Sequence, residues 1–259
     1  MSYLCLNCQR SLPAFHLACP DCGAWSSLKL KSAEADAGDA RPIALSMVRA
    51  VPGPRIGTGI VQLDKFLGNG FVPGSSTLLV GEPGSGKSTL VLQLLTRLKT
   101  PSLYVSGEES IQQLKFRADR LKIFSPYILL VNETNVRKVA AHIHETAPKA
   151  VVIDSIQTMY SDLSGGYPGS SAQIRKTAAL LRRLAQEMGH VLILVGQVTK
   201  NLNAAGPQLL QHAVDVVLSL EIDESDTRRR LLYARKNRFG STSLRCRLSM
   251  RASGLAFSI

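Results

Sequence analysis

The chain of 259 residues contains 31 Lys and Arg against 19 Asp and Glu, so its formal net charge is +12 and a polyanionic partner is favoured. Its 45% hydrophobic and 19% charged residues exclude wholesale disorder, and at roughly 100 to 200 residues per domain we expect one large domain with a small appendage. No apolar run approaches the ~20 residues that cross a bilayer, and the N-terminus lacks the pattern of a secretory signal, so we expect a cytoplasmic protein without membrane spans.

Four of the five cysteines form two closely spaced pairs at the N-terminus. Cys5 and Cys8 make one Cys-x-x-Cys pair, and Cys19 and Cys22 make the second after ten intervening residues. Two such thiolate pairs suit a tetrahedral Zn²⁺ site with four sulfur ligands. The sequence therefore predicts a four-cysteine zinc finger over residues 1–30, stabilised largely by its metal.

Residues 31–54 are predicted to be a linker, because the stretch from Ser32 to Pro42 is small, polar and acidic and lacks apolar periodicity. From about residue 55, short aliphatic runs alternate with helical patterns, which is typical of a mostly parallel α/β sheet. The predicted strands are Thr77–Val80, Ser102–Ser106, Ile128–Val131, Ala150–Asp154 and Val191–Gly196. The predicted helices lie near Lys87–Lys99, Ile111–Leu121, Val136–Thr146 and Ser171–Met188.

The helix over Ser171–Met188 has the clearest signals. Its apolar residues recur on one helical face, Ser170 and Gln173 form an S-x-x-Q capping box, and Gly189 suits the left-handed C-terminal position. After Asp215 the pattern changes to consecutive strands, which predicts an antiparallel extension of the sheet. These strands are Val216–Glu221, Leu231–Arg235, Leu244–Leu248 and Ala256–Ile259.

A phosphate-binding loop lies between the first predicted strand and helix. The segment matches G-x-x-x-x-G-K-[ST], and we expect it to bind ATP through Gly81, Glu82, Pro83, Gly84, Ser85, Gly86, Lys87, Ser88 and Thr89. Its backbone N–H groups and the helix N-terminus attract phosphate. Lys87 would neutralise the β- and γ-phosphates, and the Ser88 hydroxyl would bind Mg²⁺.

Three other strand ends carry polar side chains at the same predicted edge of the sheet. Asp154 ends the run AVVID and would hold Mg²⁺ through water, although it could also cap the next turn. Glu108 or Glu109 would polarise the attacking water, and the alternative is a pair favoured by a helix N-terminus. Gln197 would contact the γ-phosphate or belong to an ordinary loop.

Basic residues dominate the end of the chain. From Arg228 onward there are nine Lys or Arg and no Asp or Glu, and Lys236 and Arg238 lie in the segment KNRFG. Taken alone, this segment predicts only a basic turn. The loops Gln157–Gly169 and Val198–Gln208 leave the edge that carries the ATP site, and they could follow a phosphate backbone or be plain surface loops.

Taken together, these motifs resemble the bacterial RadA (Sms) family of RecA-like ATPases. The resemblance covers nearly the whole chain and rests on CPDCGAW, RIGTGIVQLDKFLGNGFVPGS, GEPGSGKST, YVSGEES with RADRL, VVIDSIQT, GQVTKNLNAAGPQLLQHAVDVVL and KNRFG. It implies a RecA-like core over residues 55–259 and a DNA-stimulated ATP hydrolase that drives branch migration during recombination and repair. It also implies single-stranded or branched DNA and a RecA-type recombinase as partners, and a homo-oligomeric ring of hexameric size. Lys236 and Arg238 would then reach the γ-phosphate in a neighbouring subunit.

The sequence departs from the family pattern at three places. Gln197 replaces a usual His, the family's LEH becomes Leu210-Gln211-His212, and only 19 residues follow Gly240, so we expect no Lon-protease-like C-terminal domain. The rival hypothesis is a KaiC-like regulatory ATPase whose zinc module docks a protein partner. A small-molecule phosphotransferase is disfavoured, because no acceptor pocket or lid is evident in the sequence.

Overall fold

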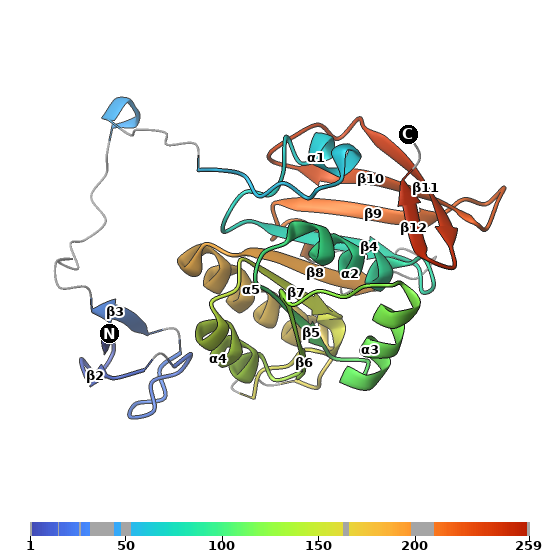
Figure 1. Ribbon diagram of the computed structural model, residues 1–259. Helices are drawn as coiled ribbons and strands as arrows, with labels where there is room; N and C mark the ends of the chain where they lie inside the picture. The colour runs from blue at the N-terminus through green and yellow to red at the C-terminus, as the bar shows by residue number, and fades with distance from the viewer. Residues whose placement is uncertain are drawn as a thin grey trace.

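The computed structural model describes residues 2–14, 16–25, 27–31, 44–47, 53–162, 166–197 and 210–257. Figure 1 shows a large layered α/β body and a small N-terminal sheet beside it. The predicted linker stretch Ser32–Pro42 and the loop Val198–Gln208 lie outside the described residues. None of the helices in the described ranges combines the length and hydrophobicity that a bilayer crossing needs.

The large sheet has nine strands in the order β12-β11-β10-β9-β4-β8-β7-β5-β6. Its parallel part contains β4 (Ser76–Gly81), β5 (Ser102–Ser106), β6 (Ile128–Asn132), β7 (Ala150–Asp154), β8 (Val191–Gln197) and β9 (Val216–Ile222). Its antiparallel extension consists of β10 (Arg229–Asn237), β11 (Arg245–Arg251) and β12 (Gly254–Phe257). The predicted mostly parallel sheet with an antiparallel C-terminal extension is therefore confirmed.

Helices cover both faces of the parallel part (Figure 1). The first face packs on α2 (Lys87–Leu98) and α3 (Ile111–Arg120), and α1 (Val61–Phe66) lies over the antiparallel extension in Figure 1. The second face packs on α4 (Val136–Thr146) and α5 (Ser171–Met188). The central strands are aliphatic along their whole length because both of their faces are buried.

The predicted helices and strands agree with the structure to within about two residues at most ends. The capping box predicted for α5 is half correct. The Ser170 hydroxyl accepts from the Gln173 backbone N–H, whereas the Gln173 amide bonds to the backbone of Ser161 and Gly166. Gly189 ends α5 in the left-handed region, as predicted. The short α1, with six residues, was not predicted.

The N-terminal segment contains a three-stranded sheet formed by β1 (Ser2–Cys5), β2 (Ser11–Leu12) and β3 (Leu28–Lys31). Cys5, Cys19 and Leu28 form its small buried cluster. Leu17 is buried in the core cluster on the α4 and α5 side of the large sheet, and Trp25 packs against the same cluster. The cysteine-containing segment therefore contacts the large body through apolar side chains.

The KNRFG segment lies where β10 ends, at the edge of the sheet where β4 and β9 begin. Asp215 connects these elements. It accepts hydrogen bonds from the backbone N–H and the hydroxyl of Ser76, over 3.0 Å and 2.8 Å, and it pairs with Arg238 over 2.9 Å. The P-loop follows β4, so it lies at the opposite edge of the sheet.

Candidate nucleotide-binding site

The P-loop connects β4 to α2 and forms the floor of a cavity of about 350 Å³. Gly81 is required by close packing against backbone, and Gly86 is required by its backbone conformation. A Cβ atom at Gly81 would lie 2.3 Å from the Leu220 carbonyl oxygen, and one at Gly86 would lie 2.6 Å from Met250 Cε. Gly86 also adopts a left-handed conformation with φ of 104° immediately before α2. The loop thus presents its backbone where a side chain would collide.

Lys87 is the buried cation of the P-loop. Its Nζ donates to the carbonyl oxygens of Gly81 and Glu82, over 2.9 Å and 2.8 Å. Burial lowers the pKa of Lys87, while Asp154, Glu108 and Glu82 oppose that shift. A cation held by weak neutral acceptors is suited to binding an incoming phosphate oxygen.

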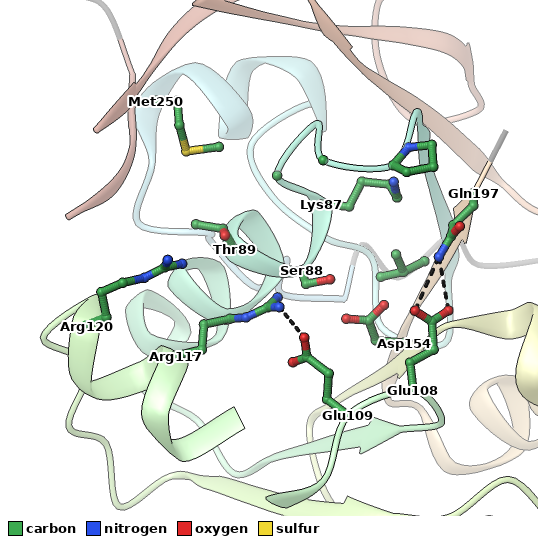
Figure 2. A pocket seen from close by; sticks show the side chains of 14 residues that line it. Lys87, Ser88, Thr89, Glu108, Glu109, Arg117, Arg120, Asp154, Gln197 and Met250 are labelled. Carbon is green, nitrogen blue, oxygen red and sulfur yellow. Dashed lines mark hydrogen bonds and ion pairs between the residues drawn. The ribbon is translucent and has the colours of Figure 1, made fainter. Parts of the chain in front are cut away.

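The ends of β4, β5, β7 and β8 bring the predicted polar residues together, as Figure 2 shows. The cavity is lined by Pro83, Gly84, Gly86, Lys87, Ser88, Thr89, Glu108, Glu109, Asp154 and Gln197 from the predicted set. Gly81 and Ser85 complete the same loop, and Glu82 faces an adjoining acidic pocket. Ten predicted residues from the P-loop and the three strand ends therefore line one cavity.

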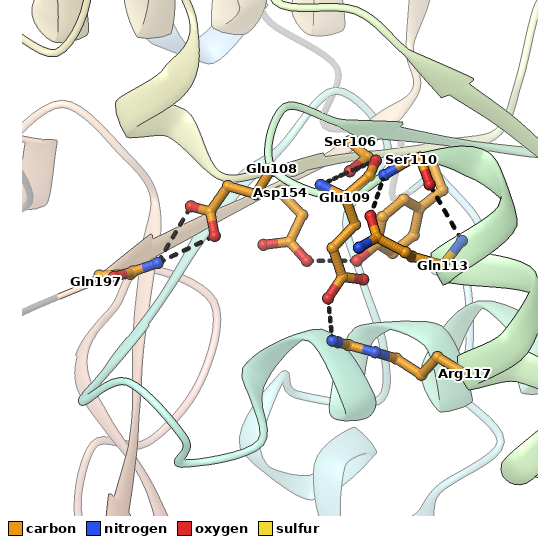
Figure 3. Close-up of polar contacts among 9 residues, drawn as sticks. Ser106, Glu108, Glu109, Ser110, Gln113, Arg117, Asp154 and Gln197 are labelled. Carbon is orange, nitrogen blue, oxygen red and sulfur yellow. Dashed lines mark hydrogen bonds and ion pairs between the residues drawn. The ribbon is translucent and has the colours of Figure 1, made fainter.

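The structure separates the two adjacent glutamates, as Figure 3 shows. Glu108 accepts from the Ser155 hydroxyl over 2.5 Å and from Gln197 Nε2 over 3.1 Å and 3.3 Å. Glu109 forms an ion pair with Arg117 of α3. The Glu108 carboxylate is thus bonded at the ends of β7 and β8, near Asp154. The charge of Glu109 is balanced by Arg117 of α3.

Asp154 has a partner that the sequence did not reveal. The hydroxyl of Tyr104, a fully buried residue of β5, donates to Asp154 Oδ2. Burial, followed by the charge of Asp154, raises the pKa of Tyr104 well above its usual value, so the hydroxyl remains a donor. This hydrogen bond fixes one carboxylate oxygen of Asp154.

Four lining residues were not predicted as site residues, and one of them is Val195 of β8. Arg117 and Arg120 come from α3, and Met250 comes from β11. In Figure 2, Arg120, Thr89 and Met250 lie on one side of the P-loop helix, while Lys87, Asp154 and Glu108 lie on the other. The RADRL segment offered a signal for the arginines, but no sequence pattern indicates Met250.

Lys236 and Arg238 do not line this cavity. Lys236 Nζ donates to the carbonyl oxygens of Gln211, His212 and Val214, and Arg238 pairs with Asp215. Both residues therefore lie at the edge of the sheet opposite their own P-loop, and their predicted catalytic role stays a prediction.

The four N-terminal cysteines form a separate candidate metal site, and their Sγ atoms all lie within 4.8 Å of one another. The Cys5–Cys22 and Cys8–Cys19 sulfur pairs are 3.7 Å and 3.6 Å apart. A tetrahedral site with Zn–S bonds of about 2.3 Å has sulfur atoms about 3.8 Å apart, so the donor set fits Zn²⁺. A hydrogen bond with Ser27 lowers the pKa of Cys5 to about 6, whereas burial and the neighbouring thiols raise the pKa of Cys8 to about 12.

The fold and this cavity together define a P-loop ATPase of the RecA-like class. The family model "ATPase: KaiC" matches residues 56–123 and 132–248. Two solved structures share the fold at TM-scores of 0.64 and 0.60: a KaiC-like protein of Pyrococcus horikoshii, 23% identical, and the RadB recombinase, 24% identical. The matches cover 80% and 77% of this chain and 100% and 98% of those structures.

Curated relatives narrow the class to one family. The DNA repair protein RadA of Halalkalibacterium halodurans is 42% identical over 98% of this chain, and that of Pseudomonas aeruginosa is 42% identical over 93%. The RadA of Escherichia coli is 38% identical over 93% of the chain. This chain therefore belongs to the RadA family. The matches span 58%, 56% and 56% of the lengths of these relatives.

Proposed function

We propose that this protein is a DNA-stimulated ATP hydrolase of RadA type that moves along DNA during recombination and repair. The observation that carries the proposal is the assembled nucleotide site in a chain that belongs to the RadA family. The net charge of +12 supports a polyanionic partner. A protein acting on chromosomal DNA in this way would work in the cytoplasm.

The site residues divide into phosphate-binding and water-activating groups. The P-loop amides and Lys87 would bind the β- and γ-phosphates, and Mg²⁺ would be held by Ser88 and, through water, by Asp154. Bound there, Mg²⁺ would offset the negative charge that develops on the phosphates. Asp154 is held in place for this task by the Tyr104 hydroxyl.

Glu108 is the better candidate for activating water. Its carboxylate is bonded to Ser155 and Gln197 at the strand ends, while the Glu109 carboxylate is engaged by Arg117. A general base must keep an acceptor oxygen directed at the attacking water. Gln197 donates to Glu108, so a contact between Gln197 and the γ-phosphate would link the phosphate to the base.

The remaining assignments concern the ends of the chain. We assign a Zn²⁺-binding finger to residues 1–30, a linker to residues 31–54 and the ATPase domain to residues 55–259. Zn²⁺ held by Cys5, Cys8, Cys19 and Cys22 would stabilise a segment whose own buried cluster is small. Lys236 and Arg238 would act on the site of a neighbouring subunit in a homo-oligomeric ring, with a RecA-type recombinase as a further partner.

The deciding experiment measures ATP turnover with and without single-stranded DNA over a series of salt concentrations. We expect DNA to raise turnover and added salt to remove the effect, because phosphate contacts release counterions. If single-stranded DNA does not change ATP turnover at any salt concentration, the proposed DNA motor is refuted and the KaiC-like regulatory ATPase is favoured. The curated relatives do not favour that alternative, since they are DNA repair proteins.

A further inference from the structure

The antiparallel extension of the sheet carries a row of arginines that the nucleotide site does not use. In the pairing of β10 with β11, Tyr233 lies opposite Arg245 and Leu231 lies opposite Arg247. Directly opposed residues point to the same face of a sheet, and so do residues two apart along a strand. We call this surface the arginine face; its members are Arg229, Leu231, Tyr233 and Arg235 of β10 and Arg245, Arg247 and Arg251 of β11.

The arginine face is the outer side of the extension. The intervening residues Leu232 and Ala234 of β10, with Cys246 and Leu248 of β11, are buried in the cluster that contains the apolar residues of α1 and α2. Arg245, Arg247 and Arg251 are exposed in contrast. The same two strands thus bury an apolar face and present a cationic one to solvent.

Only part of this positive charge is balanced. Arg235 pairs with Glu221, and Arg229 pairs with Asp226. Among the described residues, Arg245, Arg247 and Arg251 have no carboxylate within 4.0 Å. Like charges on neighbouring positions of one face repel each other. A bound polyanion would remove this repulsion.

The composition of the face indicates which polyanion fits. All of its cations are arginines, whose forked donors bind phosphate oxygens in pairs. Alternate residues of a strand are about 6.6 Å apart, which is comparable to the spacing of successive phosphates in an extended single strand. The guanidinium groups of Arg245 and Arg235 lie over the ring of Tyr233, 4.8 Å and 5.8 Å from its centroid.

A protein partner fits less well. Stable protein interfaces have an apolar centre, and the arginine face offers only the half-buried Leu231 and Tyr233 among its guanidinium groups. We propose that the arginine face binds the phosphate backbone of single-stranded nucleic acid. This inference rests on the proposed function and adds a location for the DNA on β10 and β11, away from the two predicted loops.

The test removes the three unbalanced charges together, in the variant Arg245→Gln/Arg247→Gln/Arg251→Gln. The control Lys115→Gln/Lys138→Gln/Arg183→Gln removes the same charge from exposed positions on α3, α4 and α5, where side-chain exposure is 59%, 67% and 49%. Fluorescence anisotropy of a labelled oligothymidine, measured over a salt series, gives the slope of log affinity against log salt. ATP binding and the thermal midpoint report on folding of each variant.

Each phosphate contact on a single strand contributes about 0.7 to that slope. We therefore expect the arginine variant to reduce the slope by about 2, with ATP binding unchanged, and the control to leave the slope near that of the wild type. Replacement of the same three arginines by lysine should restore the slope but only part of the affinity, since lysine keeps the charge and loses the paired hydrogen bonds.

Three outcomes contradict the inference. An arginine variant with the wild-type slope would overturn it and leave the proposed function standing. A variant that loses binding to phosphatidylglycerol vesicles or polyglutamate but keeps oligothymidine binding would show that the face serves another anion. A wild-type protein that binds no oligothymidine at low salt would refute the proposed DNA function together with this inference.

Discussion

Hydrolysis should require a neighbouring subunit, and mixing two inactive variants tests this directly. Arg238 is held by Asp215, which is bonded to Ser76 at the start of β4, whereas the P-loop begins at Gly81 at its end. Five steps along the strand at about 3.3 Å each separate Ser76 from Gly81 by about 16 Å. An arginine side chain cannot cover that distance, so Arg238 would act on another subunit's phosphate.

The expected magnitudes follow from the geometry. Arg238→Ala should bind ATP and lose about a thousandfold in turnover, as expected for a lost arginine finger. Lys87→Ala should be inactive because the phosphates lose their buried cation. The test mixes equal amounts of Lys87→Ala and Arg238→Ala subunits. In a randomly assembled ring, half of the subunits keep an intact P-loop and the other half keep Arg238. An interface therefore combines an intact P-loop with an intact Arg238 in about one quarter of cases.

The assay is ATP turnover in the mixture, normalised to the wild type, after subunit exchange has been verified by energy transfer between labelled subunits. About one quarter of wild-type turnover is expected. A mixture as inactive as its components, despite exchange, would refute catalysis across an interface. Wild-type turnover of Arg238→Ala alone would show that the basic turn has no part in the reaction.

Three other variants or treatments test separate parts of the structure. Asp154→Asn should lose at least about a hundredfold in turnover, and excess Mg²⁺ should restore part of it; normal Mg²⁺ dependence would contradict the metal role. Metal analysis should find about one Zn²⁺ per chain, and Cys5→Ser should lose it while ATP binding remains; a full complement of metal in that variant would exclude Cys5 as a ligand. Burial, followed by the neighbouring His144, lowers the pKa of His190 from 6.5 to about 4. The unfolded chain therefore takes up a proton as pH falls from 6.5 to 4, and stability should fall by about 3 kcal/mol in that window. Denaturant unfolding of His190→Leu should show a shallower pH dependence, and an unchanged slope would rule out this assignment.

The sequence predicted the structure best in two kinds of segment: continuous aliphatic runs that form strands, and motifs with a fixed residue spacing. The central strands are continuous aliphatic runs, and their carboxyl ends meet at one edge, so the convergence of Lys87, Glu108 and Asp154 could be predicted from order alone. The Cys-x-x-Cys pairs likewise implied that their sulfur atoms would converge.

Side-chain partners were less predictable, because they depend on how loops and helices pack on one another. Arg117 of α3 pairs with Glu109 just before that helix, and Met250 reaches Gly86 from the distant strand β11. The capping box of α5 failed in part because the loop before it offers Gln173 better partners in Ser161 and Gly166. These choices are decided by tertiary packing rather than by local propensity.

Strand β4 connects two functional parts of the proposed ring, one at each of its ends. Its last residue begins the loop that would bind phosphate, and its first residue is bonded to the acid that holds Arg238. Because β4 is buried and hydrogen-bonded to β8 and β9 on its two sides, we expect it to move as a rigid unit. Under the proposed arrangement, a shift of the P-loop on nucleotide release would be transmitted along β4 to the arginine serving the adjacent subunit. Nucleotide release at one site would then alter the position of the arginine at the next site.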